Sequence, residues 1–180
     1  ICCYLLSILN SKRVQKLKDK VAIADDHSVA QFGIEAVLKD NSNFEVIQKM
    51  SSSAEIIEKL DKIKIDILIL DVDLPGKSGI DFLRENRSRY SEMKIVLFTV
   101  HEGEGFFREA IRLGANGYIL KSDNILNMPI ALSSILKGEF YCSQKLMKYL
   151  VTKNYSLALT EKEISVLKLV ANGHSAREIA

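Results

Sequence analysis

A run of four apolar residues, Ile67 to Leu70, ends at Asp71, and Asp73 and the pair Pro75-Gly76 follow within five positions. An unbroken apolar run of this length, partly β-branched, is typical of a strand that is buried on both faces, as in a parallel sheet. The Pro-Gly pair predicts a tight loop directly after the strand. Asp71 is therefore expected at the carboxyl end of a central strand, where open α/β sheets bind their ligands.

The same alternation of a short apolar strand and an amphipathic helix recurs five times between residues 20 and 137. The expected strands cover residues 20–24, 44–50, 67–70, 95–99 and 118–121, and the expected helices cover 28–41, 53–63, 79–90, 104–113 and 124–137. In the first helix, Ser28 is expected as the N-cap and Phe32, Ala36 and Val37 as the apolar face. The pattern predicts an α/β fold, a flavodoxin-like doubly wound five-stranded parallel sheet in the order 2-1-3-4-5.

The flanks of this domain have a different character. Residues 1–19 form a leader of unknown role, whose apolar start is too short to span a bilayer and is followed by basic residues, the reverse of a signal peptide. Residues 138–158 are interpreted as a linker with a turn at 138–143 and a short helix over 144–151. From 159 to 180, the capping boxes Thr160/Glu163 and Ser175/Glu178 predict the start of an all-α helix-turn-helix domain, truncated at Ala180.

The overall composition indicates the cellular compartment of the protein but not its function. A formal net charge of +2 is too small to indicate a nucleic-acid or membrane partner by itself. The three cysteines, Cys2, Cys3 and Cys142, have neither metal-ligand spacing nor an even count, which favours a reduced, cytoplasmic protein.

Polar residues lie at the carboxyl ends of four of the five predicted strands. Asp25 and Asp26 come after the first strand and Asp71 after the third, while Thr99 and Lys121 are the last residues of the fourth and fifth. Strands 1 and 4 flank strand 3 in the expected order, so Asp26 and Thr99 should approach Asp71 from its two sides. Lys121 starts two strands away, roughly 10 Å at a spacing of ~4.8 Å, and only a long side chain can span that gap.

The chemistry of these residue types points to a phosphoryl group held with a metal ion. Converging carboxylates without a nearby arginine repel one another, which raises at least one pKa unless a cation lies between them. Oxygen ligands favour a hard divalent ion, and Mg²⁺ fits best. Asp71 could then attack phosphorus to form an acyl phosphate, with Lys121 and the Thr99 hydroxyl on phosphoryl oxygens. His27 and His101 flank the crevice and are interpreted as loop residues, because neither has a partner pattern for a metal or for nucleophilic catalysis.

Taken together these motifs resemble a known family. Asp25-Asp26, the stretch from Leu70 through Asp73 and Gly76 to Gly79, Thr99, Tyr118 and Lys121 resemble the receiver domain of two-component response regulators. Residues 159–163 and 173–180 are similar to the start of the LuxR/NarL-type DNA-binding domain, so the resemblance covers about residues 20–180.

The resemblance implies a phosphoacceptor signalling protein rather than an enzyme. Asp71 would accept a phosphoryl group from the phosphohistidine of a sensor histidine kinase, and Asp25, Asp26, Asp71 and the backbone carbonyl of Asp73 would hold Mg²⁺. Thr99 and Tyr118 would form the switch pair, in which the phosphate draws in the hydroxyl and the aromatic ring turns inward.

The resemblance also implies DNA binding and dimerisation, and the sequence departs from the family pattern at two positions. DNA would be bound through the C-terminal domain, whose recognition helix lies beyond Ala180, and a homodimer would form on phosphorylation. Ser122 follows Lys121 where the family often has a proline with a cis peptide, and Leu74 stands where methionine is commoner.

Two other functions remain open from the residues alone. Asp71 and Asp73 match the Asp-x-Asp of haloacid-dehalogenase-type phosphatases, although that motif follows the first strand in those enzymes. A stand-alone receiver that signals through protein contacts is the other alternative. A P-loop is excluded because Asp71 occupies the position of its first glycine, and the chain contains no dinucleotide-binding Gly-x-Gly-x-x-Gly.

Overall fold

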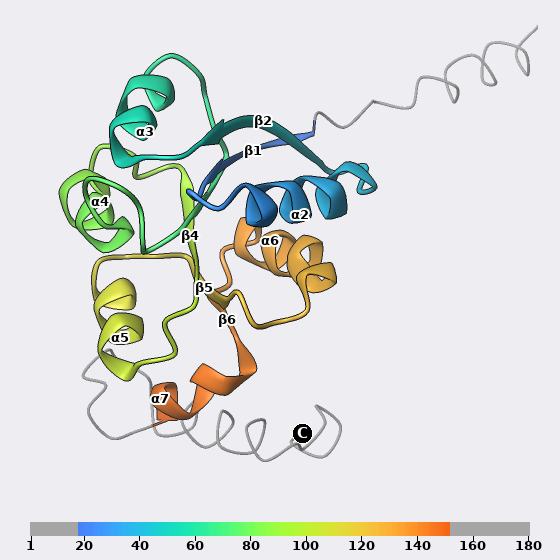
Figure 1. Cartoon of the computed structure of the whole chain (residues 1–180). Helices are drawn as coiled ribbons and strands as arrows, with labels where there is room; N and C mark the ends of the chain where they lie inside the picture. Colours follow the sequence, from blue (N-terminus) through green and yellow to red (C-terminus); the bar gives the residue numbers. More distant parts are fainter. Residues whose placement is uncertain (1–17, 152–180) are drawn as a thin grey trace, which may run out of the picture.

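The computed structural model describes residues 18–151 of the chain (Figure 1). One parallel sheet contains β1 (Asp19–Ala24), β2 (Phe44–Met50), β3 (Ile67–Leu70), β4 (Lys94–Thr99), β5 (Gly117–Leu120) and β6 (Tyr141–Cys142). The helices are α2 (Ser28–Lys39), α3 (Ser53–Leu60), α4 (Gly79–Asn86), α5 (Glu104–Arg112), α6 (Met128–Leu136) and α7 (Met147–Val151), with short 3₁₀ turns η1 (Ile125–Asn127) and η2 (Gln144–Leu146). The strand order is β2-β1-β3-β4-β5-β6, which confirms the predicted order 2-1-3-4-5 and adds one strand.

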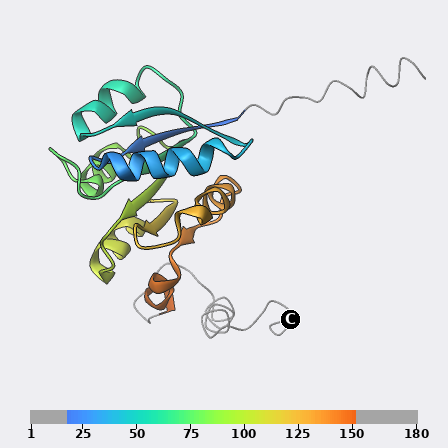
Figure 2. The ribbon, with the colours of Figure 1, turned by 45° about the vertical axis from the view of Figure 1, so that its right-hand side comes forward.

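Helices cover both faces of the sheet. Figures 1 and 2 show α2 and α6 side by side on one face and α3, α4 and α5 on the other. Successive residues of each central strand alternate between the two faces, so β3 contributes Ile67 and Ile69 to the core beneath α2 and α6, and Leu68 and Leu70 to the opposite core. All four are at most 1% exposed. Because both faces of the strand are buried, its sequence is an unbroken run of apolar residues.

The buried face of α2 differs from the predicted one. Ser28 is the first helical residue rather than the N-cap; His27 occupies the cap position and makes no side-chain capping bond. Ile34 and Leu38 are completely buried, whereas Phe32 is 64% exposed. Both sets of residues have helical spacing, and contact with the sheet, which the periodicity alone does not reveal, decides between them.

The sixth strand lies in a segment whose sequence predicts a turn and a linker. Tyr141 and Cys142 pair with Gly117 and Tyr118 of β5. Gly117 permits this approach, because a Cβ there would lie 3.2 Å from the Tyr141 carbonyl oxygen and 2.7 Å from Ile135 Cδ1. The sheet therefore continues past residue 137, where the predicted domain ended, and the helix expected over 144–151 is present as η2 and α7.

Several expectations fall outside the described residues. These are the leader up to residue 17, the end of the linker, and the whole helix-turn-helix segment 159–180 with its two capping boxes. Within residues 18–151, no helix is long and apolar enough to cross a membrane.

Candidate functional site

The backbone at the end of β3 fixes the position of Asp71. Its N–H donates to the Ala24 carbonyl of β1 at 2.8 Å, and its side chain is 2% exposed. On the other side, the Gly79 N–H donates to the Val72 carbonyl at 2.9 Å. A Cβ at Gly79 would lie 2.2 Å from the Asp71 carbonyl oxygen, so only glycine lets α4 begin this close to the site.

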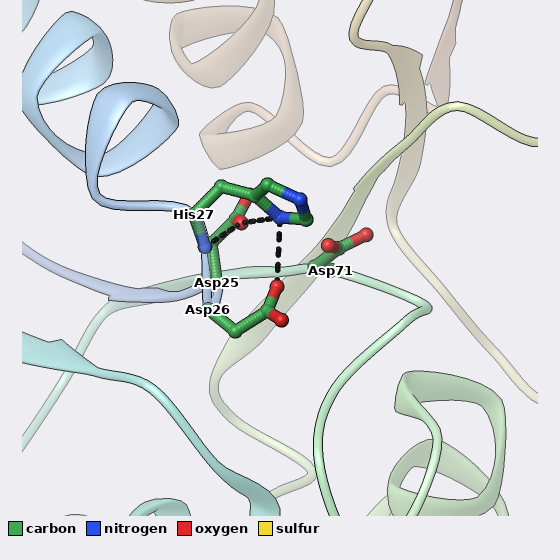
Figure 3. A group of neighbouring side chains, drawn as sticks. All are labelled: Asp25, Asp26, His27 and Asp71. Carbon is green, nitrogen blue, oxygen red and sulfur yellow. Dashed lines mark hydrogen bonds and ion pairs between the residues drawn. The ribbon is translucent and has the colours of Figure 1, made fainter.

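A second loop, at the end of β1, brings the acidic pair to Asp71. One ligand atom from each of Asp25, Asp26, His27 and Asp71 lies within 4.8 Å of the others (Figure 3). Asp25 is 1% exposed and Asp26 borders solvent. The predicted convergence of Asp25, Asp26 and Asp71 at the strand ends is therefore what the fold produces.

His27 lies in the loop between β1 and α2, as predicted, but it also belongs to this cluster, which its sequence pattern did not indicate. Its Nδ1 lies 3.2 Å from Asp25 Oδ1 and 2.7 Å from Asp26 Oδ1, and its backbone N–H donates to Asp25 Oδ1 at 2.9 Å (Figure 3). Gln31, one turn into α2, donates to the carbonyl oxygens of Asp25 and Met50 at 2.5 and 2.9 Å. These bonds fix the loop from both sides.

Lys121 reaches the cluster from β5, two strands away. Its Nζ lies 2.7 Å from Asp71 Oδ2 and 2.7 Å from Asp25 Oδ2. Burial lowers the pKa of Lys121, but the hydrogen bonds to Asp25 and Asp71 outweigh it, and the pKa is raised above its ordinary value. The ammonium is therefore charged at neutral pH. The described residues contain no cis peptide, so the Lys121-Ser122 bond is trans.

The charges at Asp71 are not balanced. Burial is the main cause that raises its pKa, the negative charge of Asp25 raises it further, and the hydrogen bond from Lys121 lowers it in part. Asp71 Oδ1 is buried and has no hydrogen-bond partner among the described residues. One ammonium faces several carboxylates, and an oxygen with free lone pairs points into the same space. This donor set fits a hard divalent cation such as Mg²⁺.

His101 links the two predicted switch residues to the loop after β3. Its N–H donates to Thr99 Oγ1 at 3.2 Å, and its carbonyl accepts from the Tyr118 hydroxyl at 2.9 Å. Its Nε2 lies 2.8 Å from Asp73 Oδ1. Thr99 and Tyr118 are completely buried, and the Tyr118 ring already points inward. These partners of His101 do not follow from a residue motif, because the His101 backbone N–H and carbonyl make two of the three contacts.

The comparisons with known proteins agree with this geometry. A family model described as the response regulator receiver domain matches residues 21–131. The oxygen regulatory protein NreC of Staphylococcus aureus is 30% identical, over 89% of this chain and 81% of that protein.

Solved structures give the same result. The RcsB response regulator of Salmonella typhimurium is 27% identical with a TM-score of 0.70, over 91% of this chain and 81% of that chain. A LuxR-family two-component response regulator from Aurantimonas sp. SI85-9A1 is 26% identical with a TM-score of 0.69, over 75% of this chain and 99% of that chain.

The family match excludes the phosphatase alternative. The Asp-x-Asp motif also follows β3, whereas in those phosphatases it follows the first strand. The predicted family is confirmed by the match of residues 21–131 and by relatives that align well beyond them. The chain belongs to the response regulators of two-component signalling, as a LuxR/NarL-type member whose receiver domain serves the regulation of transcription.

Proposed function

We propose that Asp71 is the residue that accepts the phosphoryl group. The observation that carries this proposal is the unpartnered, buried Asp71 Oδ1 beside an ammonium shared with Asp25. Asp71 Oδ1 attacks phosphorus in line with the leaving group, the bond from phosphorus to the donor breaks, and an acyl phosphate forms. Lys121 can leave its ion pair with Asp71 Oδ2 for a phosphoryl oxygen without moving its charge out of the crevice.

Asp25, Asp26, Asp71 and the backbone carbonyl of Asp73 would hold the Mg²⁺ ion of this site. When bound, it neutralises charge on the phosphoryl group and on the carboxylates. His27 positions the Asp25 and Asp26 carboxylates through its contacts of 3.2 and 2.7 Å. The Asp73 carboxylate is turned to His101, which leaves its backbone as the part available to the metal.

The donor is the phosphohistidine of a sensor histidine kinase, and the surface beside the crevice supports a protein donor. Val29, three residues after Asp26, is 83% exposed, and Phe32 is 64% exposed. Leu126 and Ile130, on the η1–α6 segment that packs against α2, are 66% and 65% exposed. Large exposed apolar side chains on two neighbouring elements agree with a protein interface there.

The steps after phosphorylation are inferred from the family and not from the geometry of the site. The protein acts as a phosphoacceptor and not as an enzyme with turnover of a substrate, Thr99 and Tyr118 act as the switch pair, and residues 159–180 begin the DNA-binding domain. RcsB has been solved as dimers bound to DNA, and a homodimer on phosphorylation is proposed for this chain as well. The free thiol of Cys142 agrees with a cytoplasmic location.

The decisive experiment is phosphorylation by acetyl phosphate with Mg²⁺, followed by intact mass measurement and mapping of the modified residue. A single phosphoryl group is expected at Asp71, with acetate as the leaving group. Asp71→Asn should abolish it, and Asp73→Asn, a matched change two residues away, should keep it. Labelling that persists in Asp71→Asn, or that maps to Asp73, would remove Asp71 from this role.

The metal site can be tested apart from phosphorylation. Asp26→Ala should weaken Mg²⁺ binding about tenfold or more, measured by calorimetric titration, because it removes a carboxylate from the cluster. Asp40→Ala, an exposed carboxylate at the end of α2, serves as the control and should leave the affinity unchanged. Equal affinities in the two variants would contradict the metal assignment.

A further inference from the structure

Residues Tyr141–Val151, here called the arm, dock on the end of β5 although the sequence suggested a linker. Ser143 is 2% exposed, and its N–H donates to the Tyr118 carbonyl at 3.0 Å. Its hydroxyl accepts from the Leu120 N–H at 2.7 Å. These groups are buried, so neither bond can be exchanged for water while the arm stays in place. Ser143 therefore fastens the arm to β5.

Side chains of the arm also cover the aromatic residues next to the switch. Leu146 is 1% exposed, and Tyr149 on α7 lies 6.2 Å from the Phe107 ring. Phe107 in turn meets Tyr118 edge to face, with 5.4 Å between ring centroids. Lys145 pairs with Glu102, on the β4–α5 loop, at 3.0 Å. An aromatic contact path thus runs from Tyr118 through Phe107 to the arm.

The phosphoacceptor site and the arm are therefore both connected to the same short strand, β5. Lys121, directly after β5, reaches Asp71 and Asp25, while Leu120 and Tyr118 bond to Ser143. Part of the surface of α5 and β5 beside the switch is therefore in contact with this chain's own arm. The arm is also the segment through which residues 18–140 connect to residues 152–180.

We propose that the arm reads the occupancy of the Asp71 site: a phosphoryl group there shifts the docking equilibrium of Tyr141–Val151 through β5 and the Tyr118–Phe107–Tyr149 contacts. This inference rests on the proposed function and adds where the signal goes. A close-packed element of this kind responds by moving between discrete packings, so a change at Lys121 and Tyr118 alters how well Ser143 and Tyr149 fit.

The chain contains a reporter of arm docking in Cys142. This residue lies on β6, is 7% exposed and is the one free cysteine of the described residues. Burial raises the pKa of its thiol to about 11, so it stays protonated near neutral pH while docked. Thiol reagents attack the exposed thiolate, and the labelling rate of Cys142 therefore measures how often the arm opens.

The experiment uses the full chain with Cys2 and Cys3 replaced by serine, and beryllofluoride with Mg²⁺ as the phosphoryl mimic. Binding of the mimic is followed by ¹⁹F NMR, and the labelling rate of Cys142 by N-ethylmaleimide and mass measurement. A coupling of ordinary size would change this rate about fivefold or more when the mimic is bound. Ser143→Ala should speed labelling about tenfold without the mimic, since it removes a buried hydrogen bond.

Tyr149→Leu tests the aromatic path. It should bind the mimic as the parent chain does and lose most of the response of Cys142. Tyr90→Leu, the same change at a half-buried tyrosine stacked on Phe82, should keep the response. Bound mimic with an unchanged labelling rate in the parent chain would overturn the inference and leave Asp71 assigned, and an undiminished response in Tyr149→Leu would also overturn it. No binding of the mimic would overturn the proposed function as well.

Discussion

At the scale of single residues, Asp71 combines burial with an excess of negative charge. Lys121 is shared between Asp71 and Asp25, and Asp71 Oδ1 has no partner among the described residues. An ionised carboxyl group in this setting costs free energy of folding, because burial and the charge of Asp25 both disfavour it. Sites that act on charged groups commonly carry such a cost.

Asp71→Asn should therefore stabilise the protein at neutral pH in the absence of metal. The pKa of Asp71 is raised above its ordinary value of 3.8, so the folded state favours the protonated carboxyl group. The stability that this protonated group contributes is complete below pH 3.8 and is lost as the pH rises through the raised pKa. Asparagine keeps an oxygen for Lys121 and carries no charge. We expect a gain of about 1 kcal/mol at pH 7 that disappears below pH ~4, measured by urea unfolding. A loss of stability at pH 7 would contradict this account of the site.

The sequence could predict the residues of the cluster whose positions follow from strand order. Asp25, Asp26, Asp71 and Lys121 each follow a strand, and parallel strands bring their carboxyl ends to one edge of the sheet. The partners of His27 and His101 could not be found in this way. Their contacts depend on backbone angles in two loops, and no period or spacing in the sequence encodes those angles.

At the scale of elements, the start of α4 sets how tightly the loop after β3 closes on the site. Gly79→Ala would place a Cβ 2.2 Å from the Asp71 carbonyl oxygen, so the helix or the strand end must shift. We expect a loss of stability of roughly 1–3 kcal/mol and slower phosphorylation of Asp71, measured by thermal unfolding and by labelling with acetyl phosphate.

Gly105→Ala is the matched control for this change. Gly105 lies in the first turn of α5 with nothing within 4 Å of the added Cβ, so alanine should be neutral or stabilising by up to about 1 kcal/mol. Equal effects at the two glycines would show that helix propensity, and not the approach to Asp71, accounts for the result.

Elements were predicted well where hydrophobic pattern and length agree, as in β2 and β3, whose bounds were predicted without error. The helix after Gly79 ends at Asn86 instead of near residue 90, because the Arg87 side chain donates to the carbonyls of Tyr90 and Met93 and organises a non-helical connection. β6 has two residues, too few for any period, and its pairing depends on Gly117.

At the scale of the whole molecule, the sheet and the arm extend past residue 137, where the sequence predicts the end of the receiver domain. The sixth strand extends the sheet beyond it, and Leu146 packs into the same core as Leu120 and Phe107. The family match to residues 21–131 covers the strands that hold the site but not this last layer. The receiver domain is therefore more completely packed when it includes the arm.

A chain ended after Lys137 should be much less stable than one ended after Val151. The shorter chain uncovers the fully buried Phe107 and Tyr118 and leaves the buried Leu120 N–H without the Ser143 hydroxyl. The loss of this apolar cover and of the hydrogen bonds should cost on the order of 3–5 kcal/mol, measured as the difference in urea unfolding free energy. Equal stabilities would mean that the arm only rests on the domain. A large difference would mean that any force that loosens the arm also loosens β5, the strand that holds Tyr118 and leads directly into Lys121.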